Sequence, residues 1–445
     1  MLQQICMSPK LILRSSTWRF RMAYERHECL DMCVLGHFQA MPMEICDFIL
    51  EYLSVSDIST LSLVSKSINK HVLNYISSTN GGRRLFRQDF HTSGLAEGKS
   101  GTSILEHYRS LGLLFKRCTF LMATRQRLKY VRRMLCDIPC FKLCGCRAPL
   151  QCLGLQCCGS FLKILTAGWD EYECHKVYNF LCDLTNLTVK MQNVLNRKPG
   201  SAEELEWRVR LYCRNVMLDH WTVRSVSAFW LSRLLKPWPA VHQARLLYII
   251  FGPVSATDGH VLWTSLSEGV VDMSSLEGLA DALRLLYSSE AREWTAQDVT
   301  GLLDELSVMP QAWLLENNVR LLILCGNEIC FMFLAGRAVT GHTADLARTV
   351  VFLVLVCEKD FYSMKWAVKT VQRVCKMFRS NAERRNFLKI MENAFAQVFM
   401  DLLGSVISGG RGEDDSNFQT LFCLVKAQAN FHKEILYLTL NCLPV

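Results

Sequence analysis

The chain has 445 residues, of which 50% are hydrophobic, 20% are charged and 10% are aromatic. This composition excludes a generally disordered chain, a collagen-like repeat and a long coiled coil, and the length allows about two to four domains. Fifty Lys and Arg residues against 41 Asp and Glu leave a net charge of +9, which permits acidic partners without requiring nucleic acid.

We do not expect the first 40 residues to direct secretion. Charged residues interrupt their apolar residues, so no signal-peptide core forms, and we expect a disordered basic tail over 1–40. The 21 cysteines of the chain are then expected to be free thiols in a protein of the nucleus or cytoplasm. No uninterrupted apolar run approaches the ~20 residues of a membrane helix, so we expect no membrane contact.

Residues 41–77 show the strongest helical pattern. Pro42 suits the first turn of a helix, where its missing N–H is not needed. Three sets of apolar residues recur at helical spacing: Met41, Ile45, Phe48, Ile49, Tyr52 and Leu53; Ile58, Leu61 and Val64; and Ile68, Val72 and Tyr75. Three helices of this size cannot bury all their apolar surface by themselves. Some of it must rest on the rest of the chain or on another protein.

The order and spacing of this segment resemble the F-box. The matching pieces are Met41-Pro42-Met43-Glu44-Ile45, Ile49-Leu50-Glu51-Tyr52-Leu53, Asp57-Ile58 and Leu61-Ser62-Leu63-Val64-Ser65-Lys66. Met41 replaces the usual Leu at nearly constant volume. Ser65 and Ile68 stand where many members carry Cys and an aromatic residue, so one adaptor contact is weakened.

The resemblance implies a docking module. F-boxes bind a Skp-type adaptor, which connects them to the cullin and RING subunits of an SCF ubiquitin ligase. The residues expected to contact the adaptor are Met41, Pro42, Glu44, Ile45, Ile49, Leu50, Leu53, Leu61, Val64 and Lys66. Such a receptor positions a substrate instead of reacting with it, so we expect no catalytic residue, no metal and no cofactor. The alternative is an ordinary helical hairpin buried in a larger fold.

Residues 78–104 are rich in Gly and Ser and are predicted to be a linker. Within them, the segment 94–100 is similar to a phosphate-binding loop. Three residues separate its first Gly from Gly98-Lys99-Ser100, whereas that loop requires four. We therefore expect no nucleotide site.

Residues 105–198 form a helical segment that is both basic and rich in cysteine. Between His107 and Cys136 there is no acidic residue, but there are eight basic ones: Arg109, Lys116, Arg117, Arg125, Arg127, Lys129, Arg132 and Arg133. They could receive an acidic or phosphorylated target segment, contact nucleic acid, or form a solvated helix face. We do not expect a nucleic-acid partner.

Seven cysteines follow closely: Cys136, Cys140, Cys144, Cys146, Cys152, Cys157 and Cys158. Their irregular spacing does not specify the two close pairs of a typical zinc site, so packed or surface thiols are the favoured interpretation. If zinc does bind, we would first test Cys140, Cys144, Cys157 and Cys158.

Residues 199–445 are predicted to be almost entirely helical. Ser201 with Glu204, Ser274 with Glu277, and Thr295 with Asp298 have the spacing of a capping box before an apolar stripe. We therefore expect an all-α protein in which a three-helix F-box precedes a large helical domain, either a solenoid-like stack or an irregular one. WD40 and leucine-rich periods are absent, which favours the "F-box only" class. This region would capture target proteins for ubiquitination; the alternative is a scaffold that binds and protects a partner.

Overall fold

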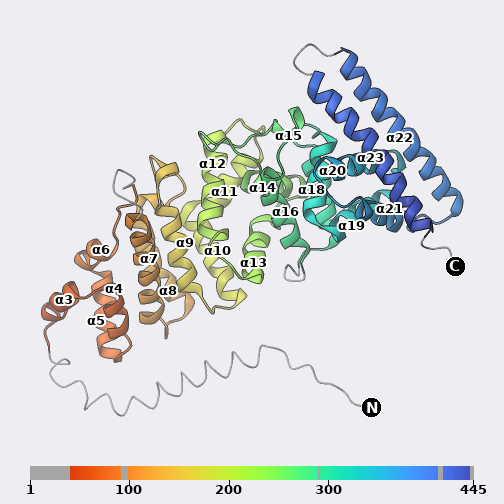
Figure 1. Cartoon of the computed structure of the whole chain (residues 1–445). Helices are drawn as coiled ribbons and strands as arrows, with labels where there is room; N and C mark the ends of the chain where they lie inside the picture. The colour runs from red at the N-terminus through yellow and green to blue at the C-terminus, as the bar shows by residue number, and fades with distance from the viewer. Residues whose placement is uncertain (1–40, 92–98, 289–290, 292, 409–413, 441–445) are drawn as a thin grey trace, which may run out of the picture. The chain divides into compact units, whose positions relative to one another are not determined.

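The computed structural model describes residues 41–91, 99–288, 291, 293–408 and 414–440. Every regular element in these residues is a helix, and the only strand-like pairing among them is an isolated bridge between Val254 and Val261. The predicted all-α class is confirmed (Figure 1). The tail predicted for 1–40 and most of the segment similar to a phosphate-binding loop lie outside the described residues.

The chain divides into two compact units, residues 1–180 and 181–445. The division falls inside α10 (Glu171–Thr185), whereas the sequence suggested a boundary at 198–199. Pro199 and Gly200 instead form a turn between α11 (Leu187–Leu195) and α12 (Glu203–Tyr212), which pack on each other. Gly200 has a φ of +76° and its N–H donates to Glu206 Oε1 at 3.0 Å. The pair is a tight turn inside a helical stack, not a domain boundary.

The first unit begins with three helices, as the sequence predicts: α3 (Met43–Tyr52), α4 (Val55–Leu61) and α5 (Lys66–Ser77). Ser54 caps α4 by accepting a hydrogen bond from the Asp57 N–H at 3.2 Å, and Ser65 caps α5 in the same way from Ile68. α3 packs on α5, and α4 packs on α7 (Lys99–Cys118). The three helices therefore rest on later helices of the same unit.

A fourth helix, α6 (Thr79–Leu85), lies within the predicted linker, so that prediction is wrong for these residues. Ser78 Oγ accepts a hydrogen bond from the Gly81 N–H at 3.1 Å, and Leu85 is buried. A Cβ atom at Gly81 would lie 2.0 Å from the carbonyl oxygen of Tyr75. Glycine is needed here because α6 approaches α5 closely, and not because the chain is a loop.

The rest of the first unit is organised around α7. This helix packs closely on α9 (Gly154–Thr166), because a Cβ at Gly112 would lie 2.7 Å from the carbonyl oxygen of Phe161. Between them in sequence lie α8 (Thr124–Asp137) and two short 3-10 turns, η2 (Pro139–Phe141) and η3 (Pro149–Gln151). The cysteine-rich segment is therefore mostly irregular.

The second unit is a helical stack. After α11 and α12 it contains these helices: η4 (Cys213–Leu218), α13 (Arg224–Leu235), α14 (Ala240–Phe251), α15 (Ser265–Glu268), α16 (Ser274–Tyr287), α17 (Ala296–Ser307), α18 (Leu315–Cys325), α19 (Asn327–Thr340), α20 (Thr343–Lys359), α21 (Met364–Cys375), α22 (Asn381–Ser408) and α23 (Asp414–Leu440). The even-numbered helices α12 to α22 pack on one another in order, and α17, α19, α21 and α23 do the same (Figure 1). Within these two series, each helix packs on the one two places along the chain, as in a solenoid.

One of the three predicted capping boxes is confirmed. At the start of α17, the Asp298 N–H donates to Thr295 Oγ1 at 3.1 Å, and the Thr295 N–H donates to Asp298 Oδ2 at 2.9 Å. Ser201 and Ser274 are not caps: α12 starts after Ala202, and Ser274 already lies inside α16. A three-residue spacing does not by itself fix where a helix begins.

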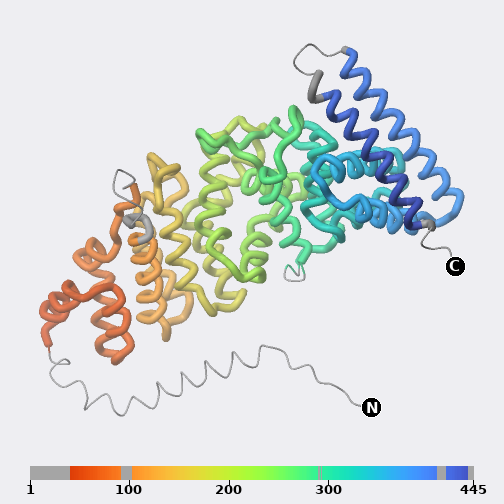
Figure 2. The backbone as a smooth tube through the Cα atoms, viewed as in Figure 1, coloured from red at the N-terminus to blue at the C-terminus, as the bar shows by residue number. Residues whose placement is uncertain are grey.

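By length and composition, one helical segment in the described residues could cross a bilayer: Asn381–Ile407 of α22, with a mean hydropathy of 1.3 over its most apolar window. The sequence predicts no helix that could span a membrane, because no uninterrupted apolar run is long enough. For α22 that prediction is wrong, because the mean hydropathy of a window can be high although a few charged residues interrupt it. α22 packs on α20 and α23 (Figure 2). Its Phe387 and Phe395 are buried. Only 22% of the apolar window is buried, and the absence of membrane contact stays a prediction.

Candidate functional site

The outward face of α3 carries an exposed apolar stripe. Ile45, Phe48 and Tyr52 are spaced by three and four residues, which places them on one side of the helix. Their exposed fractions are 48%, 57% and 76%. The rings of Phe48 and Tyr52 lie edge to face, with centroids 5.0 Å apart. Exposed aromatic side chains in contact with each other are typical of protein-binding surfaces.

The opposite face of α3 is turned toward α5. Cys46, Ile49 and Leu50 line a small cavity of about 40 Å³ together with residues of α4 and α5: Leu61, Ile68, His71 and Val72. Leu50 is only 3% exposed. The single broad stripe expected from the sequence is therefore two faces of one helix, of which only one is open to a partner.

A second exposed apolar group lies at the turn between α4 and α5. Leu63 and Val64 are both exposed there. The turn is held by Ser62, whose hydroxyl donates to the Ser59 carbonyl oxygen at 2.7 Å, and by Ser65, which caps α5. The backbone is thus fixed while the two side chains face outward.

The ten predicted adaptor contacts fall into three groups. Pro42, Glu44, Ile45, Val64 and Lys66 are exposed, and Met41, Ile49, Leu53 and Leu61 are half-buried. Leu50 belongs to the core between α3 and α5, so its prediction as a contact residue is wrong. The remaining nine stay predictions. The four exposed apolar residues that the site prediction missed are Met43, Phe48, Tyr52 and Leu63.

Arg84 of α6 holds α3 in place. Its Nη1 donates to the Leu50 carbonyl oxygen at 2.7 Å and to Tyr75 Oη at 3.2 Å, and its Nη2 donates to the Leu53 carbonyl oxygen. A guanidinium at the end of a helix satisfies carbonyls that have no partner within the helix and is favoured by its dipole. The position of the exposed stripe is therefore fixed before any partner arrives.

Further side-chain bonds attach α4 and α5 to α7. Arg117 Nη1 donates to Ser59 Oγ at 3.1 Å, and Asn69 Nδ2 donates to the Cys118 carbonyl oxygen at 3.0 Å. Near the inner face of α3, burial raises the pKa of the Asp47 carboxyl, and the charge of Glu51 raises it further. A surface fixed in this way loses little conformational freedom on binding.

The basic segment does not form one continuous binding face. Lys116 Nζ donates to the Ala167 carbonyl oxygen at 2.7 Å. Arg127 is buried, donates to Thr119 Oγ1 at 3.2 Å and lies 4.3 Å from the ring centre of Trp169. Together with Arg117 these residues stabilise the first unit. The basic residues exposed on α8 are Arg125, Lys129, Arg132 and Arg133.

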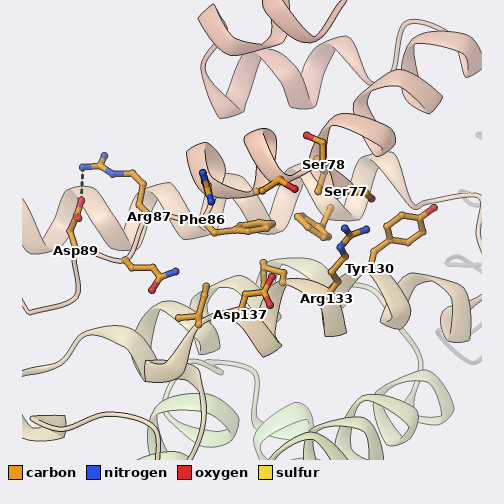
Figure 3. A pocket seen from close by; sticks show the side chains of 16 residues that line it. Ser77, Ser78, Phe86, Arg87, Asp89, Tyr130, Arg133 and Asp137 are labelled. Atoms are coloured by element: carbon orange, nitrogen blue, oxygen red, sulfur yellow. Dashed lines mark hydrogen bonds and ion pairs between the residues drawn. The ribbon is translucent and has the colours of Figure 1, made fainter. Parts of the chain in front are cut away.

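A cavity of about 550 Å³ lies between the end of α5, α6 and α8 (Figure 3). Arg87 and Arg133 line it, but so do Asp89 and Asp137, and Arg87 already pairs with Asp89 at 3.1 Å. The charges of both signs make this cavity a poor match to a dedicated phosphate site.

The suggested zinc ligands are not brought together. Cys157 and Cys158 are buried within α9, and burial raises the pKa of the Cys157 thiol to about 12, while Cys144 is exposed. Of the four suggested ligands, only Cys140 lies in a group of side chains that could hold a metal.

Comparisons with known proteins give a match within each of the two units. A model described as "F-box domain" matches residues 38–77, and one described as "FBXO47, ARM repeats" matches residues 184–414. The chain is 61% identical over 406 residues to F-box only protein 47 of Homo sapiens, covering 91% of this chain and 90% of the relative. It is 60% identical over 412 residues to the Mus musculus protein of the same name, covering 93% and 91%. No solved structure matches. The F-box resemblance is confirmed, and the helical stack corresponds to ARM repeats.

Proposed function

The chain belongs to the F-box only protein 47 family, and from this premise we propose that it is the substrate-recognition subunit of an SCF ubiquitin ligase. In this proposal, the stripe on α3 and the α4–α5 turn dock on a Skp-type adaptor, which joins the chain to the cullin and the RING subunit. The ARM-repeat stack binds the target proteins. The observation that carries the proposal is the exposure of Ile45, Phe48 and Tyr52.

The energetics of this stripe support a docking role. Burying a large apolar side chain is worth about 1.5–3 kcal/mol, and a few such residues commonly supply most of the affinity of an interface. The same residues do not stabilise the isolated chain, because their side chains remain in water. Nor is the stripe held loosely, since Arg84 fixes the helix that carries it. An exposed but rigid apolar surface favours a partner of complementary shape.

F-box proteins are in general non-catalytic receptors, and we propose the same for this chain. Its contribution would be positional: holding a target beside a charged ubiquitin carrier raises the effective concentration of the target lysine. Stacked helical repeats suit target binding, because each repeat adds surface of the same kind. After the residues that match the ARM repeats, Phe418, Phe422 and Val425 share one face of α23 and are exposed, so they offer a further apolar surface.

Co-purification tests the proposal. The intact protein is expected to retain both the Skp-type adaptor and the cullin, and a Phe48→Asp/Tyr52→Asp double variant is expected to lose both. Phe361→Asp is a matched control, because Phe361 is 92% exposed and lies far along the chain in the second unit. The control should retain both partners.

The competing function is a scaffold that protects its partner. If the adaptor co-purifies but the cullin never does, the scaffold function is correct and the ligase function is wrong. Loss of a bound target's ubiquitination in cells that carry the double variant would support the ligase. We also propose residence in the nucleus or cytoplasm, as predicted from the sequence. Imaging of the tagged chain tests this.

A further inference from the structure

Four side chains with metal-binding atoms converge in the first unit. They are His91, Cys140, Cys146 and Cys152, and their ligand atoms all lie within 4.8 Å of one another. His91 Nε2 lies 3.3 Å from Cys140 Sγ and 3.7 Å from Cys146 Sγ. We propose that these four residues form a structural zinc site.

Two of the distances between these atoms are close to those around a tetrahedral zinc ion. Bonds of about 2.3 Å to sulfur and about 2.0–2.1 Å to nitrogen place neighbouring ligand atoms about 3.5–3.8 Å apart. The two distances from the His91 nitrogen lie within about 0.2 Å of this range, and all four ligand atoms lie within 4.8 Å of one another. Side-chain movements of up to about 1 Å would therefore bring all four to zinc-binding distances. Three thiolates and one imidazole are a common donor set of structural zinc sites.

The local backbone is built around these side chains. The Leu153 N–H donates to the Phe90 carbonyl oxygen at 3.1 Å, which joins the residue before His91 to the start of α9. The next residue, Gly154, donates its N–H to Cys152 Sγ at 3.3 Å. Such a bond orients a ligating sulfur. The fold therefore supplies a second shell as well as ligands.

Gly154 shows how closely the segments approach. A Cβ at this position would lie 2.6 Å from the Cβ of Cys140 and 3.2 Å from the Sγ of Cys152. Any other residue would push these two cysteines away from their present positions. Glycine is thus required by the close approach of the thiols, and not by its backbone angles.

A structural role follows from the surroundings. Four protein ligands fill the coordination of zinc and leave no open position for a reacting water. The cysteines lie in a segment whose only regular elements before α9 are η2 and η3. Next to them, Phe90, Tyr108 and Phe141 form an aromatic cluster with ring centres 5.5 to 5.7 Å apart. Zinc would attach this irregular segment to the chain that precedes it, as in other small metal-bound modules.

Metal analysis of the full chain tests the proposal directly. The protein is purified without metal-affinity chromatography after growth with added zinc, and its zinc is measured by mass spectrometry. We expect one zinc ion per chain, and cobalt exchanged into the protein should show thiolate-to-cobalt charge-transfer bands. A wild-type chain that binds no zinc would overturn the proposal. So would a disulfide among Cys140, Cys146 and Cys152 in protein kept under reducing conditions.

Single substitutions distinguish the proposed zinc ligands from nearby cysteines. Cys146→Ser and His91→Ala should lose most of the zinc, whereas Cys144→Ser should retain it, because Cys144 is exposed and outside the group. His91 is exposed, so His91→Ala should keep the helical circular-dichroism signal, and His91→Cys should restore zinc binding with a fourth thiolate. Equal zinc loss from Cys144→Ser and Cys146→Ser would contradict the assignment. Loss of the site would leave the adaptor-docking proposal standing.

Discussion

α3 of the F-box and α14 of the ARM-repeat stack are both short helices with apolar residues on several faces. In α14, Leu246, Leu247, Ile249 and Ile250 are all buried, because neighbouring helices cover every side. In α3, Leu50 is buried but Phe48 and Tyr52 are exposed. A helix that is apolar all round normally lies inside a protein. The difference indicates that no described residue covers the outward face of α3, which supports the proposal that an adaptor docks there.

The largest predicted effect on stability comes from the buried core around α14. Leu247→Ala in α14 should lower the free energy of unfolding by about 2–5 kcal/mol, because it leaves a cavity in a fully packed core. Ile45→Ala in α3 should change it by no more than about 0.5 kcal/mol, since Ile45 is half exposed. Denaturant unfolding of both variants measures this. Equal losses would contradict the distinction between the two helices.

For the exposed face of α3, we predict weaker adaptor binding without a loss of stability. Phe48→Ala and Tyr52→Ala should each weaken adaptor binding by about 2 kcal/mol, or roughly 30-fold, as expected for central aromatic residues of an interface. Titration calorimetry with a purified Skp-type adaptor measures the change. Tyr172→Ala serves as the control, because Tyr172 is an exposed tyrosine on α10. An unchanged affinity in the α3 variants would place the adaptor elsewhere.

A third prediction concerns the side chain that holds α3. Arg84→Met should lower the free energy of unfolding by about 1–3 kcal/mol, because it leaves the carbonyl groups of Leu50 and Leu53 without this hydrogen-bond donor. Hydrogen exchange should become faster over residues 43–53, while exchange in α14 should stay the same. Arg83→Met is the matched control, since Arg83 is exposed on the same helix. If both variants behave alike, Arg84 does not position α3.

The smallest predicted effect is a pH dependence in the first unit. Burial lowers the pKa of His107, whose Nε2 lies 2.7 Å from the Leu85 carbonyl oxygen. The unfolded chain therefore binds a proton more readily than the folded one, and stability falls as the pH drops below about 6.5. His107→Gln should reduce this dependence. Thermal unfolding of both proteins between pH 7.5 and about 5.5 measures it, and an identical slope would exclude His107 as the cause.

The sequence predicts where the helices of the F-box lie, but it does not predict which of their faces are buried and which are exposed. Local signals are sufficient for α3, α4 and α5, because Pro42 stands at the start of α3 and the apolar residues of all three helices recur at helical spacing. Which face of α3 is covered depends on α5 and on Arg84, which reaches α3 from a later helix. Phe48 and Tyr52 were visible in the helical spacing, but the spacing could not show that they face outward.

Long-range contacts also explain the other errors. α6 was missed because Gly81 and Gly82 are typical of loops, whereas the structure requires Gly81 for close packing on α5. The cysteine spacing could not identify the proposed zinc ligands, because His91 precedes all of them and reaches them through the pairing of Phe90 with Leu153. The boundary at 198–199 was wrong for a similar reason, since a Pro-Gly turn inside a stack has the same sequence as a linker.

Radical footprinting of side chains, with and without a bound Skp-type adaptor, tests the central claim most directly. It measures the solvent exposure of individual side chains, and methionine and aromatic residues react readily. We predict that the adaptor protects Met43, Phe48 and Tyr52 on α3 and Leu63 at the α4–α5 turn, while Phe361 in the second unit reacts as before. Unchanged reactivity of Phe48 and Tyr52 in a saturated complex would contradict the claim that this surface receives the adaptor.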